Sequence, residues 1–114
     1  MKKIKFYVHP KIGKENESTN DKYILLSYFL SDRRSIKYID ITIEELETIA
    51  SGEKTFEEVY DPSFVIDVGY GAGEFECNKD TAYFISNNPE SEPNIEMPLQ
   101  ELIDLLKEWK TFLS

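Results

Sequence analysis

The stretch PLQELIDLLKEWKTFL, residues 98–113, decides the fold of this chain. Its large apolar residues recur at helical spacing, which places them along one face of a helix. These residues are Leu99, Leu102, Ile103, Leu106, Trp109 and Leu113, with Leu105 and Phe112 widening the face. Pro98 suits the first helical position, where no backbone N–H is needed. We therefore predict an amphipathic C-terminal helix that packs its apolar face across a sheet.

The residues before this helix predict a meander of three short strands. Residues 64–68 and 74–77 alternate between apolar and polar side chains, and residues 81–86 follow the turn Asn78-Lys79-Asp80. The apolar members of this alternation would share a buried face: Phe64, Ile66, Val68, Phe75 and Cys77. The acidic members would share the outward face: Asp67, Glu74 and Glu76.

The first forty residues carry three further strand signals. Residues 4–8 alternate between apolar and other side chains and end at His9-Pro10, where proline removes a hydrogen-bond donor. Residues 23–30 are almost continuously apolar, which favours a central strand covered on both faces. Residues 36–41 favour another strand, after a turn over residues 31–34.

Two capping patterns predict helices in the middle of the chain. Thr42 and Glu45 have the spacing of a capping box, so a helix should begin at Thr42 and end at Gly52, which suits a left-handed terminus. Thr55 and Glu58 repeat the pattern and predict a second, shorter helical turn. The polar residues 13–22 and 87–94 are typical of loops.

Together these elements predict one α+β domain over residues 1–114. It should contain a mainly antiparallel sheet of about five or six strands, with the C-terminal amphipathic helix packed on it. A length of 114 residues suits a single domain. No apolar run approaches the ~18 residues of a membrane span. The single cysteine, Cys77, excludes an internal disulfide and fits a reducing compartment, so we expect a cytoplasmic protein without membrane contact.

Charge is strongly asymmetric along the chain, whose net charge is −9. Residues 1–40 hold nine Lys/Arg and five Asp/Glu, a balance of +4, whereas residues 41–114 hold four and seventeen, a balance of −13. The acidic part should repel phosphate backbones, so we expect no nucleic-acid binding. It should attract a partner with a basic surface and accelerate the encounter. The alternative is that the acidic residues only keep the protein soluble.

The residue types that usually carry catalysis are scarce. His9 and Cys77 are the only histidine and cysteine, and a nucleophilic pair would require them to be adjacent. Cys77 is in phase with Phe75, which favours a buried structural thiol, and His9 at a strand end favours an exposed edge position. With so few ligands a zinc site is not expected. We therefore predict no catalytic residue, no metal and no cofactor.

The run GYGAG, residues 69–73, has the glycine content of a phosphate-binding loop. Such loops lead into a helix whose N-terminus faces the anion. This run leads instead into the strand pattern Glu74-Phe75-Glu76. We predict a flexible hairpin turn with Tyr70 exposed at its tip, where it is available to a partner.

Acidic residues form the candidate partner-binding surface together with Tyr70: Glu44, Glu47, Glu53, Glu57, Asp61, Asp67, Glu74 and Glu76. Three of them, Asp67, Glu74 and Glu76, come from neighbouring predicted strands. Three close carboxylates suit a hard metal such as Mg²⁺ or an acid–base pair. Contact with a basic partner and a plain solvated surface are the other interpretations.

The second half of the chain resembles the C-terminal part of small bacterial immunity proteins of toxin–immunity pairs, including contact-dependent growth inhibition. The resemblance covers roughly residues 61–114 and rests on a strand meander followed by a leucine-rich helix that ends in Trp-Lys. The residues that carry it are Asp61-Pro62, Phe64-Val65-Ile66, Phe75-Glu76-Cys77, Ala82-Tyr83-Phe84, Ile95-Glu96-Met97-Pro98-Leu99 and Leu102-Ile103-Leu105-Leu106-Lys107-Glu108-Trp109-Lys110.

This resemblance implies a protein that binds and neutralises one cognate toxin without catalysis. Many such toxins are basic nucleases, which the acidic balance beyond residue 40 would complement. One alternative is an acidic adaptor, regulatory binding module or nucleic-acid mimic. Another is a small enzyme that uses Asp67, Glu74 and Glu76.

Overall fold

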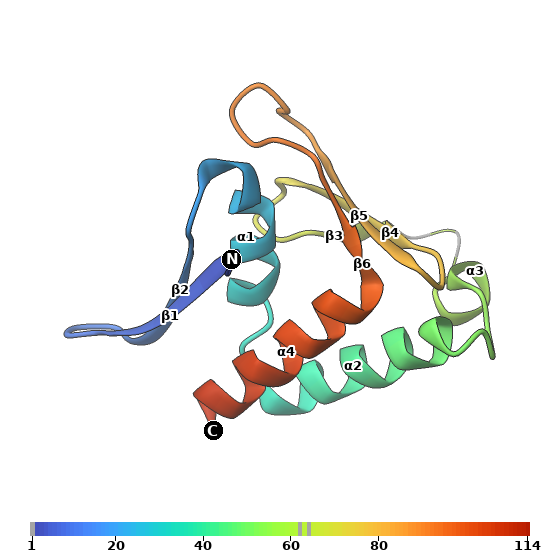
Figure 1. The fold of residues 1–114 in the computed structure, drawn as a ribbon, viewed down its shortest axis with the longest axis horizontal. Helices are drawn as coiled ribbons and strands as arrows, with labels where there is room; N and C mark the ends of the chain where they lie inside the picture. Colours follow the sequence, from blue (N-terminus) through green and yellow to red (C-terminus); the bar gives the residue numbers. More distant parts are fainter. Residues whose placement is uncertain (1, 62, 64) are drawn as a thin grey trace.

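A computed structural model describes residues 2–61, 63 and 65–114. The elements follow one another as shown in Figure 1: β1 (Ile4–His9), β2 (Gly13–Ser18), a short 3-10 helix (Asp21–Tyr23), α1 (Ile24–Ser31), α2 (Ile36–Ala50), α3 (Phe56–Val59), β3 (Ile66–Asp67), β4 (Gly73–Cys77), β5 (Thr81–Ser86), β6 (Ile95–Pro98) and α4 (Leu99–Leu113).

The strands form two antiparallel sheets. One is a four-stranded sheet in the order β3-β4-β5-β6, and the other is the hairpin of β1 and β2. Helices α1 and α4 pack on the four-stranded sheet, and α2 runs beside α4 (Figure 1). The predicted α+β class is confirmed, although the six strands are divided between two sheets. In the described part of the chain, no helix has both the length and the apolar character needed to cross a membrane.

Helix α4 has the packing that its sequence predicts. The centre of its apolar face is fully buried, whereas Leu105, Phe112 and Leu113 are half-buried; the fully buried residues are Leu99, Leu102, Ile103, Leu106 and Trp109. Pro98 differs from expectation, because it ends β6 and caps the helix rather than opening its first turn. Strand β6 runs directly into α4, where the Leu99 amide donates to the Asp80 carbonyl at 2.9 Å.

The expected strand over residues 23–30 is wrong, because this segment is helix α1. Four of its apolar side chains are buried against the sheet and the β1–β2 hairpin: Leu25, Leu26, Phe29 and Leu30. A helix enclosed on several sides is apolar on all of them. Periodicity alone does not separate such a helix from a buried strand.

The expected strand over residues 36–41 and the helix start at Thr42 are also wrong. Both belong to one helix, α2, whose N-cap is Ser35, with its hydroxyl accepting from the Tyr38 amide. Thr42 lies inside this helix and its hydroxyl donates to the Tyr38 carbonyl at 3.0 Å. The short helix after it is confirmed, with both hydrogen bonds of the Thr55–Glu58 capping box present.

Two strands differ from the expectations, and the first of them lies in the expected loop over residues 13–22. Residues 13–18 form β2, and the buried Asn16 on this strand accepts from Ser27 and donates to Ser31, which fixes the hairpin on α1. Residues 95–98 form β6, whereas residues 87–94 remain a loop as predicted. The expected position of Phe64 lies outside the described residues.

Arg33 joins the helices to the sheet from a buried position just after α1. Its guanidinium donates to the carbonyls of Phe29, Val68 and Asp67 at 3.1–3.2 Å and lies 3.6 Å from the Phe29 ring centroid. Its own backbone carbonyl accepts from the indole N–H of Trp109 at 2.9 Å. One residue therefore connects α1, the β3 region and α4.

We expect Arg33→Met to destabilise the protein by about 3 kcal/mol, because three carbonyls lose their donor in the core. The matched control is Arg34→Met, since Arg34 is exposed and pairs with Glu15, and surface pairs contribute less than about 1 kcal/mol. Denaturant unfolding of the two variants measures the difference. If Arg33→Met and Arg34→Met lose the same free energy of unfolding, the role of Arg33 in the core is contradicted.

Candidate functional site

The four-stranded sheet has one covered face and one open face. Directly paired residues of antiparallel strands lie on the same face. The pairs Phe75–Phe84 and Ala82–Met97 lie on the covered face, and all four side chains are buried. The alternate positions therefore belong to the open face, which α1 and α4 leave uncovered (Figure 1).

Acidic side chains dominate the open face. Glu76 and Glu96 flank Tyr83 in one row across β4, β5 and β6. Glu74 pairs with Asp67 on one side and with Ile85, 40% exposed, on the other. We call this surface the acidic face: Asp67, Glu74, Glu76, Tyr83, Ile85 and Glu96.

The carboxylates of the acidic face are not neutralised within the described part of the chain. All ion pairs among the described residues use acids that lie on other surfaces: Lys3–Glu101, Lys5–Glu17, Arg33–Asp32, Arg34–Glu15, Lys107–Glu47 and Lys110–Asp40. None involves an acid of the acidic face. Because neighbouring like charges repel one another across strands, this surface destabilises the folded protein slightly. A cationic partner would relieve the repulsion.

The structure brings together three of the predicted site residues, Asp67, Glu74 and Glu76. The other acids lie on or next to α2 and α3, and all are exposed: Glu44, Glu47, Glu53, Glu57 and Asp61. The Glu47 carboxylate pairs with Lys107 of α4 at 3.1 Å, and that of Asp61 accepts from the Ser63 amide. The predicted surface is therefore divided between the helices and the sheet.

Glu96 is a member of the acidic face that sequence reasoning missed. It alternates with the buried Ile95 and Met97, and this pattern is the signal of a strand. The segment is only four residues long and lies between prolines, so the pattern is short. Only the pairing of Tyr83 with Glu96 places this carboxylate in one row with Glu76, on the other side of Tyr83.

The turn between β3 and β4 is held by hydrogen bonds and close backbone contacts. The Asp67 carboxylate accepts from the amides of Gly69 and Gly71 at 3.1 and 3.3 Å. A Cβ on Gly69 would lie 2.8 Å from the Tyr28 carbonyl oxygen, and one on Gly73 only 2.2 Å from that of Ile85. Gly69 and Gly73 therefore allow close backbone packing, whereas Gly71 has open space around it, and no helix N-terminus follows the run.

Tyr70 sits at the tip of this turn with a backbone φ of 57° and is 66% exposed. A bulky residue in the left-handed region is strained, and such strain is concentrated at functional sites. The ring stacks edge-on against Tyr28, with centroids 5.5 Å apart. Exposure of Tyr70 is as predicted, but its ring is held by a contact with α1.

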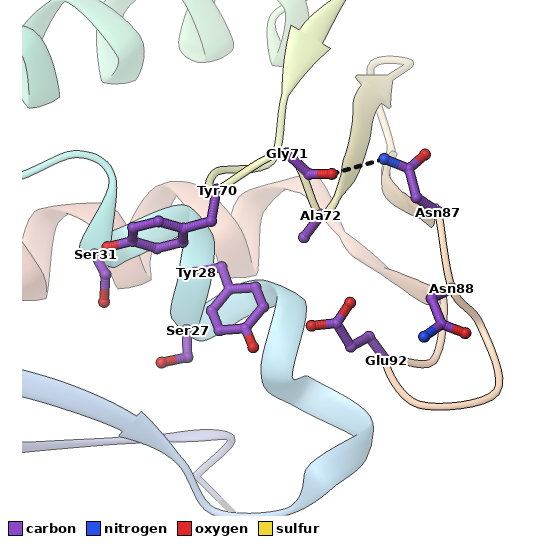
Figure 2. Close-up of a pocket in the computed structure, with 9 residues that line it drawn as sticks. All are labelled: Ser27, Tyr28, Ser31, Tyr70, Gly71, Ala72, Asn87, Asn88 and Glu92. Carbon is purple, nitrogen blue, oxygen red and sulfur yellow. Dashed lines mark hydrogen bonds between the residues drawn. The ribbon is translucent and has the colours of Figure 1, made fainter.

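A cleft opens below Tyr70, between α1, the β3–β4 turn and the loop of residues 87–94 (Figure 2). Its volume is about 620 Å³. Figure 2 shows Tyr70 reaching over α1, Tyr28 rising from α1, and the Glu92 carboxylate directed at Tyr28 from the loop. The Asn87 side chain donates to the Gly71 carbonyl at 2.8 Å and ties the loop to the turn. The pKa of the Tyr28 hydroxyl is raised. Burial is the larger cause, and the nearby Glu92 carboxylate adds to it.

We expect Tyr70→Gly to be more stable than Tyr70→Ala by about 1 kcal/mol, because glycine adopts the left-handed conformation without steric cost. At most positions the alanine variant is the more stable of the two, so the expected order of stability is reversed here. Both variants lose the contact with Tyr28, so their comparison isolates the backbone. Urea unfolding measures the difference, and an alanine variant as stable as the glycine variant would show that the turn relaxes.

His9 and Cys77 lie in different sheets and do not form a pair. The His9 ring nitrogen Nδ1 accepts from the amides of Lys11 and Ile12 and closes the β1–β2 turn. Cys77 is buried on the covered face of the four-stranded sheet. Burial, and to a lesser extent the Glu57 and Glu76 carboxylates, raise the pKa of its thiol to about 12.

The raised pKa of Cys77 predicts a loss of stability in alkali. Above the pKa of the unfolded thiol, about 8.5, the unfolded chain releases a proton that the native protein retains, so the free energy of unfolding falls as pH rises. Between about pH 8 and pH 10 the protein should lose about 2 kcal/mol more than Cys77→Ala. Denaturant unfolding across this pH range measures the stability of the unchanged protein and of Cys77→Ala. If the two stabilities fall in parallel with pH, the raised pKa of Cys77 is contradicted.

The described residues contain no group of three or more His, Cys, Asp or Glu arranged to hold a metal ion. Asp67, Glu74 and Glu76 lie on one face but do not converge on such a site. A scan against protein-family models, a search of curated proteins and a search of solved structures found no match for this chain.

Proposed function

We propose that this protein is a non-catalytic binding module whose acidic face binds a basic surface of a protein partner. The observation that carries the proposal is the row Glu76–Tyr83–Glu96, in which two unpaired carboxylates flank a tyrosine on a rigid sheet. Tyrosine is a frequent anchor of protein interfaces. Charged groups around such an anchor accelerate association and select partners of opposite charge.

In its specific form, the proposal is that the partner is a bacterial toxin domain and that the protein is its immunity protein. The resemblance of residues 61–114 to immunity proteins supports this form, and the resembling segment contains the whole acidic face. The action would take place in the cytoplasm, which suits a chain with one reduced, buried cysteine. A toxin with a basic surface, such as a nuclease, fits the charge of the face.

The first experiment tests the partner. The C-terminal domain encoded by the open reading frame upstream of this gene is expressed with and without this protein. We expect growth arrest that this protein relieves, together with a stable one-to-one complex in vitro. If the upstream gene encodes no toxin, or coexpression leaves growth inhibited, the immunity function fails and an adaptor or regulatory module replaces it.

The second experiment tests the face. The double variant Glu76→Gln/Glu96→Gln should associate with the partner about tenfold more slowly at low salt, and its association rate should depend less on salt. Stopped-flow or surface-based kinetics measures the association rate and its dependence on salt. Stability should not fall, because the change removes mutual repulsion rather than a native contact.

The matched control is Glu44→Gln/Glu53→Gln, which removes two exposed charges from the α2 side and reaches the same net charge. It should associate almost as fast as the unchanged protein. If this control is impaired and the sheet variant is not, the interface lies on the helices. Equal small effects in both variants would mean that only net charge matters.

A further inference from the structure

The cleft between Tyr28 and Tyr70 has the chemistry of a cation site. The two rings are nearly perpendicular, at 80°, and Tyr70 remains mostly exposed at the entrance. Aromatic faces attract cations through the ring quadrupole, and a guanidinium adds planar stacking. The Glu92 carboxylate is directed toward the Tyr28 ring in Figure 2.

Charge in this cleft has only one sign. Glu92 is the only charged residue that lines it, and no described Lys or Arg does so. The Glu92 carboxylate is half-buried and forms no ion pair in the described part of the chain. An anionic ligand would therefore meet repulsion, whereas a cation would meet an unpaired carboxylate.

Some of the remaining polar groups of the cleft can accept hydrogen bonds. Hydroxyls of Ser27 and Ser31 are already engaged with Asn16. The Asn87 side-chain N–H donates to Gly71, which leaves its carbonyl oxygen as an acceptor. A guanidinium has five N–H donors and no acceptor, so it complements such a lining better than a neutral amide does.

The cleft is preorganised by the backbone. Residues 69–71 all have positive φ, including the strained Tyr70, and the carboxylate of Asp67 accepts from the amides of Gly69 and Gly71 on either side of it. The tyrosine ring is thereby kept over α1 before any ligand arrives. Such strain is retained only where the surrounding structure enforces it.

We propose that this cleft binds the guanidinium group of an arginine side chain presented by a protein partner. The planar group would stack on the face of one tyrosine ring and meet the other, nearly perpendicular ring at its edge, and the Glu92 carboxylate would pair with it. Because the β3–β4 turn joins the cleft to the acidic face, one partner can reach both. The identity of that partner rests on the proposed function. Arginine binding in the cleft is tested without the partner.

The test uses Nα-acetyl-arginine amide as the probe and Nα-acetyl-citrulline amide as its neutral isostere. From ligand efficiency we expect a dissociation constant of about 1–10 mM for the arginine probe. Chemical shifts of the Tyr28 and Tyr70 rings and of the Asn87 and Asn88 side-chain amides should follow the titration. The citrulline probe should bind at least about tenfold more weakly.

Two variants and one control locate the binding. Glu92→Gln should weaken the arginine probe about tenfold, and Tyr70→Leu about threefold. Glu90→Gln is the matched control, because Glu90 is exposed on the same loop and does not line the cleft. Thermal unfolding checks that all three variants remain folded.

The outcomes separate this inference from the proposed function. If the arginine and citrulline probes bind equally, if neither binds, or if Glu90→Gln weakens binding as much as Glu92→Gln, the cleft is not an arginine site. The acidic face can still bind its partner in that case. If the arginine probe binds as expected but the upstream domain does not, the cleft stands and the toxin partner is wrong.

Discussion

The buried guanidinium of Arg33 is the constraint on which the rest of the structure depends. Burial lowers its pKa, so the protein must supply partners that keep the charge favourable. It does so with three backbone carbonyls and the face of Phe29. Two of these carbonyls belong to Val68 and Asp67, so the charge can be satisfied only when α1 lies against the β3 region. The Trp109 indole completes the arrangement by binding the Arg33 carbonyl, which aligns α4.

This packing assigns the two faces of the four-stranded sheet. With α1 and α4 on one side, the apolar positions of β4, β5 and β6 face the core and the acidic positions face outward. Several acids of the helical surfaces are neutralised by lysines, as in the pairs of Glu47 with Lys107 and Asp40 with Lys110. The acids of the sheet have no such partners among the described residues. The sheet therefore presents a group of carboxylates that no described lysine or arginine neutralises, and such a group attracts positively charged surfaces.

Asp67 couples the core, the acidic face and the cleft. Its carbonyl accepts from Arg33, and its carboxylate holds the amides of Gly69 and Gly71. Its outward position on β3 also places it next to Glu74. The strained conformation of Tyr70 is therefore supported by a residue that the core itself positions. A change that loosens the core at Arg33 should also loosen the turn, so binding defects in core variants have a structural cause as well as a local one.

The sequence by itself determined the elements whose signals are local: the amphipathic α4, the β3–β5 meander, the capping box of α3 and the charge asymmetry. Each depends on spacing within a few residues. Tertiary structure decided whether residues 24–31 are helix or strand, because an element buried on several sides has no periodicity to read. It also decided the pairing of β2 with β1, the burial of Arg33 and the position of Glu96 across Tyr83 from Glu76. These features depend on contacts between residues far apart in the chain, and only the packed fold brings those residues together.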